Sequence, residues 1–264
     1  MSEAKSKGER RREDILTLLK RNGELSVKEI VDAFGCSEAT ARRDLDVLSK
    51  SREVIRTIGG AAFEGYTGAE ASFHEKKHIS WLEKEAIAAT AASLVEEGDV
   101  IGLTGGSTTF MIARALKSRR NITIVTNAIN IAYELADSDG LQVVVTGGVM
   151  RGKSFELCGP LAETTVSGLH IGTMFLGVDG VTAAHGVTTH NELEARIGRQ
   201  LMERSSRTIA VFDRSKAGRA SLFGIAPLEA LAGCITDAPL DEPLAGALRD
   251  RGIPIWISER KSNP

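Results

Sequence analysis

The 264-residue sequence is poor in cysteine and has no long apolar run. Cys36, Cys158 and Cys234 are far apart and odd in number, so we expect reduced thiols and neither a disulfide framework nor a metal site. No run of 18 apolar residues is present to span a membrane, and the opening MSEAKSKGERRRED has no apolar core for a signal peptide. These absences predict a cytoplasmic protein that has no membrane contact and no bound metal or other cofactor.

The sequence also lacks a strong net charge, since 33 Lys and Arg residues stand against 35 Asp and Glu residues. Residues 1–60 hold 13 basic and 11 acidic residues, a balance of +2, which leaves −4 for the rest of the total of −2. This distribution is compatible with nucleic-acid binding by the N-terminal part but does not establish it. The length suits one large domain or two moderate ones.

Three helical patterns follow one another in residues 11–50. The first carries apolar residues on one stripe, and the second begins with Ser26 and Glu29 in the spacing of a capping box and ends at Gly35. The third begins at Ser37 and directs Ala41, Leu45 and Leu48 inward. Three helices with a tight turn before the third are typical of a helix-turn-helix.

The third helix has a polar outer face, and its N-terminal half is the part that reaches base edges in such domains. Residues 53–61 follow as an alternating strand and a Gly-Gly turn, which predicts a hairpin wing whose arginines meet phosphates. From the pattern alone, a small helical bundle with a solvated charged face stays open as the alternative. The candidate DNA-contacting residues are Ser37, Glu38, Thr40, Arg42, Arg43, Arg52 and Arg56.

After residue 60 the sequence pattern changes from helical to weakly periodic, and then to alternating apolar and helical segments. Residues 61–80 have little periodicity and predict a linker between a DNA-binding domain (1–60) and a second domain (81–264). In the second domain, apolar runs such as VIGL, ITIVT, LQVVVTG and TIAVFD alternate with helical segments. This alternation predicts an α/β fold with a mostly parallel sheet, whose ligands bind at the carboxyl ends of the strands.

The stretch IGLTGGSTTF, residues 101–110, is the first candidate site in that sheet. A strand ends in two glycines, which allow close approach to an oxyanion, and three hydroxyl residues then begin a helix. The hydroxyls and the free amides of the helix predict a phosphate cradle that has neither a Walker A nor a Rossmann pattern. A plain turn with a hydroxyl cap is the alternative. The residues concerned are Gly105, Gly106, Ser107, Thr108 and Thr109.

Polar residues also follow the other predicted strands. Cations and hydroxyls suit a phosphate, whereas carboxylates and amides suit the hydroxyl groups of a sugar. Each residue taken singly has an ordinary structural explanation, such as a turn cap or a helix-surface charge, but their repeated placement favours one binding crevice. The further candidates for a phosphorylated-sugar site are Thr126, Asn127, Gly148, Arg151, Asp179, His190, Asn191, Glu194 and Lys216.

The motifs resemble those of a known family. Residues 11–61, with their S-x-A-T-x-R-R-D-L core and closing GGA, resemble the DNA-binding domain of DeoR-family bacterial transcriptional regulators. Residues 74–258 carry blocks similar to the sugar-phosphate sensor domain of that family, among them TGGVMRGKSFELCGP, FLGVDGV and FDRSK. The resemblance implies a winged helix-turn-helix that binds operator DNA. The block HGVTTHNELEAR is similar to the branch that serves N-acetylgalactosamine and related amino sugars.

The predicted sensor domain is similar to ribose-5-phosphate isomerase in its phosphate loop GGST, in Asp179-Gly180 and in Lys216. The second half of the isomerase's acidic block is missing, because Val181, Thr182 and Ala183 stand there. An isomerase needs a placed base, so the resemblance implies a sensor without turnover. We therefore expect an oligomeric repressor, a dimer or tetramer, that a phosphorylated sugar releases from paired half-sites. A phosphosugar isomerase with a DNA-binding head and a general protein-interaction module are the alternatives.

Overall fold

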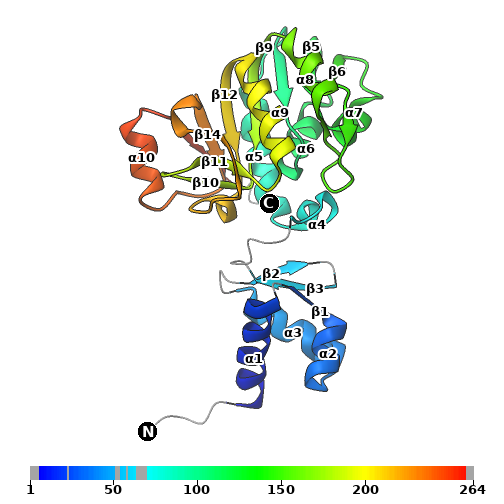
Figure 1. Cartoon of the computed structure of the whole chain (residues 1–264), viewed down its shortest axis with the longest axis vertical. Coiled ribbons are helices and arrows are strands. Elements are labelled where there is room, and N and C mark those ends of the chain that lie inside the picture. The colour runs from blue at the N-terminus through cyan, green and yellow to red at the C-terminus, as the bar shows by residue number, and fades with distance from the viewer. Residues whose placement is uncertain (1–5, 23, 51–53, 58, 64–69, 260–264) are drawn as a thin grey trace. The chain divides into compact units, whose positions relative to one another are not determined.

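The computed structural model describes residues 6–22, 24–50, 54–57, 59–63 and 70–259 (Figure 1). The chain divides into two compact units between Ala71 and Ser72. In the described part of the chain, no helix has both the length and the apolar character needed to cross a membrane.

The first unit is a winged helix-turn-helix. Its elements are α1 (Lys7–Asn22), β1 (Glu24–Ser26), α2 (Val27–Phe34), α3 (Glu38–Leu48), β2 (Val54–Thr57) and β3 (Gly60–Phe63). Ser26 and Glu29 form the predicted capping box, and Gly35 ends α2 in the left-handed conformation. Ser37 caps α3 as predicted, accepting a hydrogen bond from the amide of Thr40.

The wing is a small antiparallel sheet in the order β1-β3-β2. The prediction included β2 and the turn but not the three-residue strand β1, which is too short to show alternation. A buried carboxylate links helices α1 and α3. Asp44 of α3 accepts hydrogen bonds from two residues of α1, from Arg11 Nε at 2.5 Å and from Arg12 Nη1 at 3.3 Å. The core of this unit contains Ile15, Leu19, Ile30 and Leu45.

The second unit is built on a seven-stranded parallel sheet in the order β15-β14-β12-β9-β4-β5-β6. The strands are β4 (Val100–Leu103), β5 (Ile122–Thr126), β6 (Leu141–Val145), β9 (Ile171–Gly177), β12 (Ser205–Val211), β14 (Gly233–Thr236) and β15 (Ile255–Ile257). Every pair in this sheet is parallel, so the predicted fold class is confirmed.

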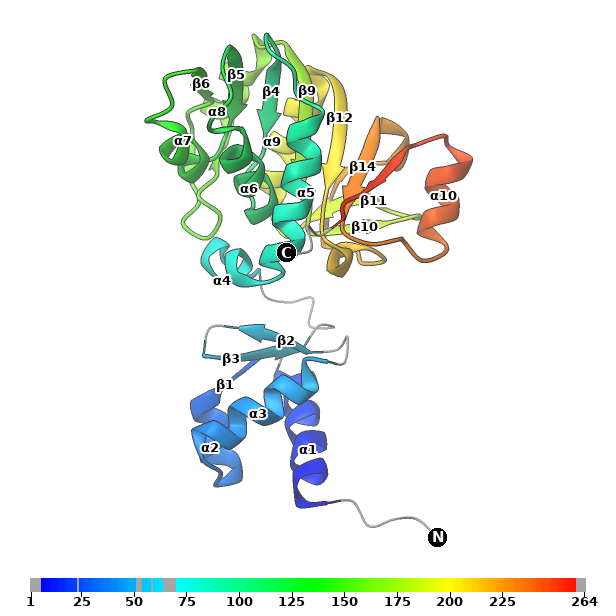
Figure 2. The ribbon, with the colours of Figure 1, turned by 180° about the vertical axis from the view of Figure 1, so that it is seen from behind.

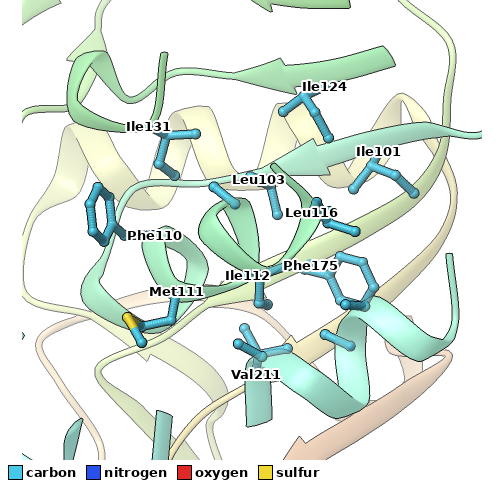
Figure 3. Close-up of a cluster of buried hydrophobic side chains, with 14 of the residues drawn as sticks. Ile101, Leu103, Phe110, Met111, Ile112, Leu116, Ile124, Ile131, Phe175 and Val211 are labelled. Carbon is cyan, nitrogen blue, oxygen red and sulfur yellow. The ribbon is translucent and has the colours of Figure 1, made fainter. Parts of the chain in front are cut away.

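Helices cover both faces of this sheet, as the views in Figures 1 and 2 show. One face carries α5 (Trp81–Ser93), α6 (Ser107–Leu116) and α7 (Ile129–Leu135), and the other carries α8 (Pro160–Ser167), α9 (Glu192–Glu203) and α10 (Leu244–Asp250). Figure 3 shows the first of the two cores, where Phe110, Met111, Ile112 and Leu116 of α6 lie beside Ile101, Leu103, Ile124, Phe175 and Val211 of the strands. The central strands are therefore buried on both sides, as their continuous apolar runs predict.

Several elements were not predicted. The range 61–80, predicted as a linker, contains the end of β3 and a helix, α4 (Phe73–His78). Ser72 and Glu75 form a capping box for α4, a spacing that is visible in the sequence. A second antiparallel sheet, β10 (Gly180–Thr182), β11 (Gly186–Thr189) and β13 (Phe223–Ala226), and a hairpin, β7 (Val149–Met150) with β8 (Leu157–Cys158), lie in segments taken as loops.

Candidate functional site

The carboxyl ends of β4, β5, β9 and β12 bring together polar residues that are far apart in the sequence. Gly105 to Ser107 follow β4, Asn127 follows β5, Asp179 follows β9, and Asp213 begins the short segment after β12. Arg151 and Glu156, from the connection around the β7–β8 hairpin, join them through Glu194 and Asn127. Among the described residues, no group of three His, Cys, Asp or Glu side chains is arranged to hold a metal ion.

The glycine turn after β4 packs closely against a buried carboxyl group. A Cβ atom at Gly105 would lie 2.1 Å from Cγ of Glu156, so only glycine fits there. Gly106, at φ +125°, is the N-cap of α6. The hydroxyl cap considered as the alternative for this turn is not seen: among the described residues no N-cap side chain bonds to the start of α6, and the Thr109 hydroxyl donates back to the Gly106 carbonyl at 3.0 Å. The first-turn amides of α6 therefore have no acceptor within the helix.

Thr126 and Asn127 are two buried polar residues at the end of β5. The Thr126 hydroxyl donates to the Leu103 carbonyl at 2.8 Å and accepts from the Ala128 amide at 3.1 Å, so it holds two strands together. Asn127 Nδ2 donates to Glu156 Oε2 at 2.9 Å. Asn127 Oδ1 is buried without a hydrogen-bond partner among the described residues.

Glu156 is the central carboxyl group that sequence reasoning missed. Burial, together with the negative charge of Glu194, raises the pKa of Glu156 to about 8. The hydrogen bond from Asn127 acts in the opposite direction. Glu156 is the one charged residue in the stretch SFELC, and a single glutamate in such a stretch is ordinarily expected to be exposed to solvent. Its burial becomes evident only from the contact with Gly105.

Asp179 has the opposite character and is held in its charged form. Lys76 Nζ of α4 donates to its Oδ1 at 2.6 Å, and the His190 amide donates to Oδ2 at 3.3 Å. Burial acts to raise the pKa of Asp179, but the charges of Lys76 and Lys216 outweigh it and place the pKa below its ordinary value. The Thr189 hydroxyl lies 3.0 Å from Asp179 Oδ2 and 3.2 Å from Glu194 Oε2, and its single proton is donated to one of these carboxylates at a time.

Glu194 forms a tight ion pair with Arg151, which links α9 to the β7–β8 hairpin. Asn191, three residues earlier, is the N-cap of α9 and accepts hydrogen bonds from the amides of Leu193 and Glu194. Gly148 lies against backbone, because a Cβ there would be 2.8 Å from the Cys158 carbonyl. Asn191 and Gly148, both predicted as ligand contacts, therefore have structural roles in the fold.

A buried lysine lies on the α5 side of the site. Lys84 Nζ donates to the carbonyls of Lys76 and Ile79 at 2.7 and 2.6 Å and lies 3.9 Å from Asp213 Oδ2. Burial lowers the pKa of Lys84 to about 8, partly offset by the charge of Asp213. The pKa of Asp213 lies below its ordinary value, because Lys216 and Lys84 outweigh the effect of burial.

The candidate DNA-binding face of the first unit lies on α3. Arg42 and Arg43 are exposed, and Arg42 Nη2 lies 3.7 Å from Glu38 Oε2. Ser37 and Thr40, by contrast, are joined by their hydroxyls at 2.9 Å and serve the helix cap. Arg56 of the wing lies 3.2 Å from Asp46 Oδ1 and donates to the Gly60 carbonyl at 3.0 Å. Arg52 lies outside the described residues.

Two family models match these two units. The model described as DeoR-like helix-turn-helix domain matches residues 11–65, and the model described as DeoR C terminal sensor domain matches residues 80–238, more than half of the chain. The chain belongs to the DeoR family.

Named relatives of this DeoR-family chain are regulators. A candidate aga operon transcriptional repressor of Escherichia coli O157:H7 is 33% identical over 94% of this chain and 93% of its own length. The glycerol-3-phosphate regulon repressor of Escherichia coli K12 is 28% identical over 94% of this chain and 98% of its own length. The ribose-5-phosphate isomerase A of Methanocaldococcus jannaschii matches at TM-score 0.39 and 17% identity, over 51% of this chain and 53% of that one. A likeness at that level carries no functional conclusion.

The predicted ligand residues of the DeoR-family sensor domain divide into two groups. The first group is linked by the contacts and charges above, with Gly105 packed against Glu156, and consists of Gly105, Asn127, Arg151, Asp179, His190, Glu194 and Lys216. Gly106 and Ser107 follow Gly105 directly at the start of α6. The hydroxyls of Thr109 and Thr126 are committed to backbone carbonyls, and Thr108 is buried within α6. Lys76, Lys84 and Glu156 also take part in the contacts above and were missed, the two lysines because their range was taken as a linker and an ordinary helix.

Proposed function

We propose that this protein is a cytoplasmic transcriptional repressor of a carbohydrate catabolic operon, released from its operator by a phosphorylated sugar. The observation that carries the proposal is that one DeoR-family chain has both an exposed α3 face and a sensor unit with a ligand-like set of polar groups. In that unit the glycine turn before the uncapped start of α6 packs against Glu156, and the neighbouring strand ends carry the Lys76–Asp179 and Arg151–Glu194 pairs. The relative named for the aga operon supports an amino-sugar pathway. Paired half-sites would require at least a dimer.

The site chemistry supports a ligand with both an anionic and a polyhydroxyl part. The first-turn amides of α6 and the Ser107 hydroxyl suit a phosphate, which helix N-termini bind through their free N–H groups and dipole. Asp179 is held ionised and Glu194 is paired with Arg151, so both present acceptor oxygens to sugar hydroxyls. A sugar phosphate can shift the protein between states only by binding one of them more tightly.

One observation favours a second candidate, a phosphosugar isomerase. Glu156 is a buried carboxyl group with a pKa of about 8 beside the glycine turn, and such a group has the acidity of a general acid–base catalyst. Its Oε2 already accepts from Asn127, however, and Val181 lies buried where the isomerase carries a carboxylate. Incubation with phosphosugars should therefore yield no new aldose or ketose, and measurable turnover would replace the repressor proposal with this one.

The first prediction concerns ligand binding. A thermal-melt panel of galactosamine, glucosamine, galactose, glucose and fructose with their 6-phosphates should show a rise for at least one phosphate and none for its unphosphorylated twin. A ligand at 100 times its dissociation constant adds about 2.7 kcal/mol to the free energy of unfolding, which raises Tm by several degrees.

Ser107→Ala should weaken that binding about tenfold through one lost charge-assisted hydrogen bond and leave operator affinity unchanged. Ser93→Ala, on the exposed side of α5, is the control.

The second prediction concerns the operator. Arg43→Ala should weaken specific binding by about 1–3 kcal/mol if the exposed guanidinium reads a base, measured by fluorescence anisotropy on operator and random duplexes at matched salt. Lys28→Ala, an exposed cation of α2, is the control for a general loss of charge. Equal loss on both duplexes would make Arg43 a phosphate contact, and no loss would remove it from the interface. Equal affinity of the wild type for both duplexes would support a general interaction module instead.

A further inference from the structure

The parallel sheet of the sensor unit ends at β6, and this edge is unlike the opposite one. Strand β6 pairs with β5 on one side, and no other described strand pairs with its outer side. Its sequence LQVVV contains four apolar residues and no charge or proline, and none of its five residues is buried. At the other edge, β15 is three residues long and directly follows Pro254. Short length, charges and prolines keep a sheet edge from pairing with another chain, and β6 has none of these protections.

Large apolar side chains are exposed around this edge, on α7, β6, β7 and α8. We call them the β6-edge patch, and they are Ile129, Tyr133, Val145, Val149, Met150 and Leu161. Ile129 and Tyr133 are four residues apart on α7 and therefore share one face of that helix. Tyr133 is 83% exposed, Val149 71% and Leu161 70%, so most of their apolar surface is in contact with water.

Contacts within the chain connect the elements that carry the β6-edge patch. The Ile129 amide donates to the Phe155 carbonyl at 3.0 Å, which joins α7 to the connection between β7 and β8. A Cβ at Gly148 would lie 3.0 Å from Cβ of Ala162, so the residue before β7 packs on α8. Figures 1 and 2 both show β6, α7 and α8 at the same edge of the sheet. The patch therefore belongs to one region of the surface.

The size and the charge of this region both suit a second copy of the chain. Six large side chains exposed by 39 to 83% present an apolar area on the order of 600 Å², close to the roughly 800 Å² that each partner buries in a standard interface. The neighbouring charges are already paired within the chain. Glu134 Oε1 lies 3.7 Å from both Arg114 Nε and Lys117 Nζ, and Glu163 Oε1 lies 2.8 Å from Arg196 Nε. Two such surfaces can therefore meet without bringing unpaired like charges together.

We propose that the β6-edge patch is the contact between two copies of this chain, with the two β6 strands antiparallel across a two-fold axis and the exposed side chains of α7, β7 and α8 beside them. The inference rests on the proposed function, which requires at least a dimer but does not say which surface forms it. A two-fold contact presents the same surface from both copies, and an uncharged strand is complementary to itself. In antiparallel pairing, each strand supplies the backbone donors and acceptors that the other lacks.

This contact lies beside the candidate effector site. Arg151 directly follows β7 and forms the ion pair with Glu194 described above. Val149 and Met150, which belong to the β6-edge patch, are one or two residues from that pair. A ligand that engages Arg151 and a second copy that packs on Val149 therefore act on the same hairpin.

The first test measures self-association of the full-length protein by sedimentation velocity over a range of concentrations. Val149→Asp and Tyr133→Asp should each weaken the association by about 100-fold or more, because a two-fold contact buries the introduced charge twice. Leu222→Asp is the matched control, since Leu222 is 79% exposed and lies outside the patch, and it should associate as the wild type does. The Tm of each variant shows whether it is folded.

The second test needs no variant. Hydrogen–deuterium exchange of wild-type residues 141–145 should slow as the protein concentration rises through the association midpoint, because the outer amides of β6 gain partners. Exchange of residues 255–257, at the other edge of the sheet, should not depend on concentration.

The outcomes separate this surface from the proposed function. A wild type that is monomeric at every concentration overturns the surface and also the paired half-sites of the proposed function. A wild type that associates, but whose Val149→Asp and Tyr133→Asp variants associate equally tightly, overturns the surface and leaves the proposed function standing. Exchange over residues 141–145 that does not depend on concentration has the same meaning, even if the variants do not fold.

Discussion

Replacing Glu156 with Gln is expected to raise the free energy of unfolding of the sensor unit by about 3 kcal/mol at pH 7 and to change it little at pH 4.5. The folded protein keeps a proton on Glu156 up to a pH of about 8, because burial and the charge of Glu194 oppose its ionisation. The unfolded chain gives that proton up near pH 4.5, the ordinary value for this group. Folding at neutral pH therefore includes the cost of taking up a proton, and glutamine removes that cost.

The sign of the pH dependence follows from the same two values. Between pH 4.5 and about 8 the folded state binds one proton more than the unfolded state at this residue, so the contribution of Glu156 to stability falls as pH rises through that window. Glutamine has nearly the same shape and keeps an oxygen that can accept from Asn127 Nδ2. The variant should therefore lose this component of the pH dependence and keep the buried hydrogen bond.

Urea unfolding followed by tryptophan fluorescence reports on the stability of the sensor unit, because both tryptophans, Trp81 and Trp256, lie in that unit. The wild type, Glu156→Gln and the exposed control Glu97→Gln should be compared at several pH values from 4.5 to 8.5. The difference between Glu156→Gln and the wild type should grow with pH, whereas the control should run parallel to the wild type. A constant difference across this range would mean that Glu156 is ionised in the folded protein.

Much of the fold was predictable, because it rests on local signals and on apolar periodicity. The capping box at Ser26 and Glu29, the cap at Ser37 and the buried strands of the parallel sheet all appear where the sequence places them. The β10–β11–β13 sheet was missed, since its three- and four-residue strands pair between segments up to forty residues apart and show no alternation. Pairings of that kind depend on tertiary contacts that a single sequence does not display.

The candidate site was predictable only in part, for a related reason. The rule that ligands gather at strand ends pointed to Gly105, Asn127, Asp179 and Lys216, which lie within five residues of the ends of β4, β5, β9 and β12. It does not reach Lys76, which comes from a helix before the first strand of the sheet. It also gave Thr126 and Asn191 a ligand role, and the structure shows that the Thr126 hydroxyl donates to a strand carbonyl and that Asn191 Oδ1 caps α9. The residue type shows which hydrogen bonds a side chain can make. Only the neighbouring atoms show whether its donors and acceptors already have partners within the protein.

Lys84→Met is expected to destabilise the sensor unit by about 3 kcal/mol, although methionine replaces the apolar part of the side chain well. The ammonium group donates to two carbonyls at the end of α4 and lies near the buried carboxylate of Asp213, so its removal leaves acceptors buried without their donor. The same fluorescence-detected urea titration at pH 7 measures the loss. Lys117→Met is the matched control, since Lys117 at the end of α6 is a half-exposed lysine whose Nζ lies 3.7 Å from Glu134 Oε1, and its removal should cost less than about 1 kcal/mol.

The Lys84 variant also bears on how α4 is held. If its end is fastened by Lys84, hydrogen–deuterium exchange over residues 76–80 should speed up in Lys84→Met without any ligand, while exchange in the central strand β9 stays slow at moderate temperature. Equal stability of the two methionine variants would show that water or a rearranged neighbour satisfies those carbonyls. In that case the end of α4 is not anchored by Lys84, and the polar contacts that hold this helix to the sensor unit are the Lys76–Asp179 pair and the hydrogen bond from the Phe73 amide to the Lys153 carbonyl.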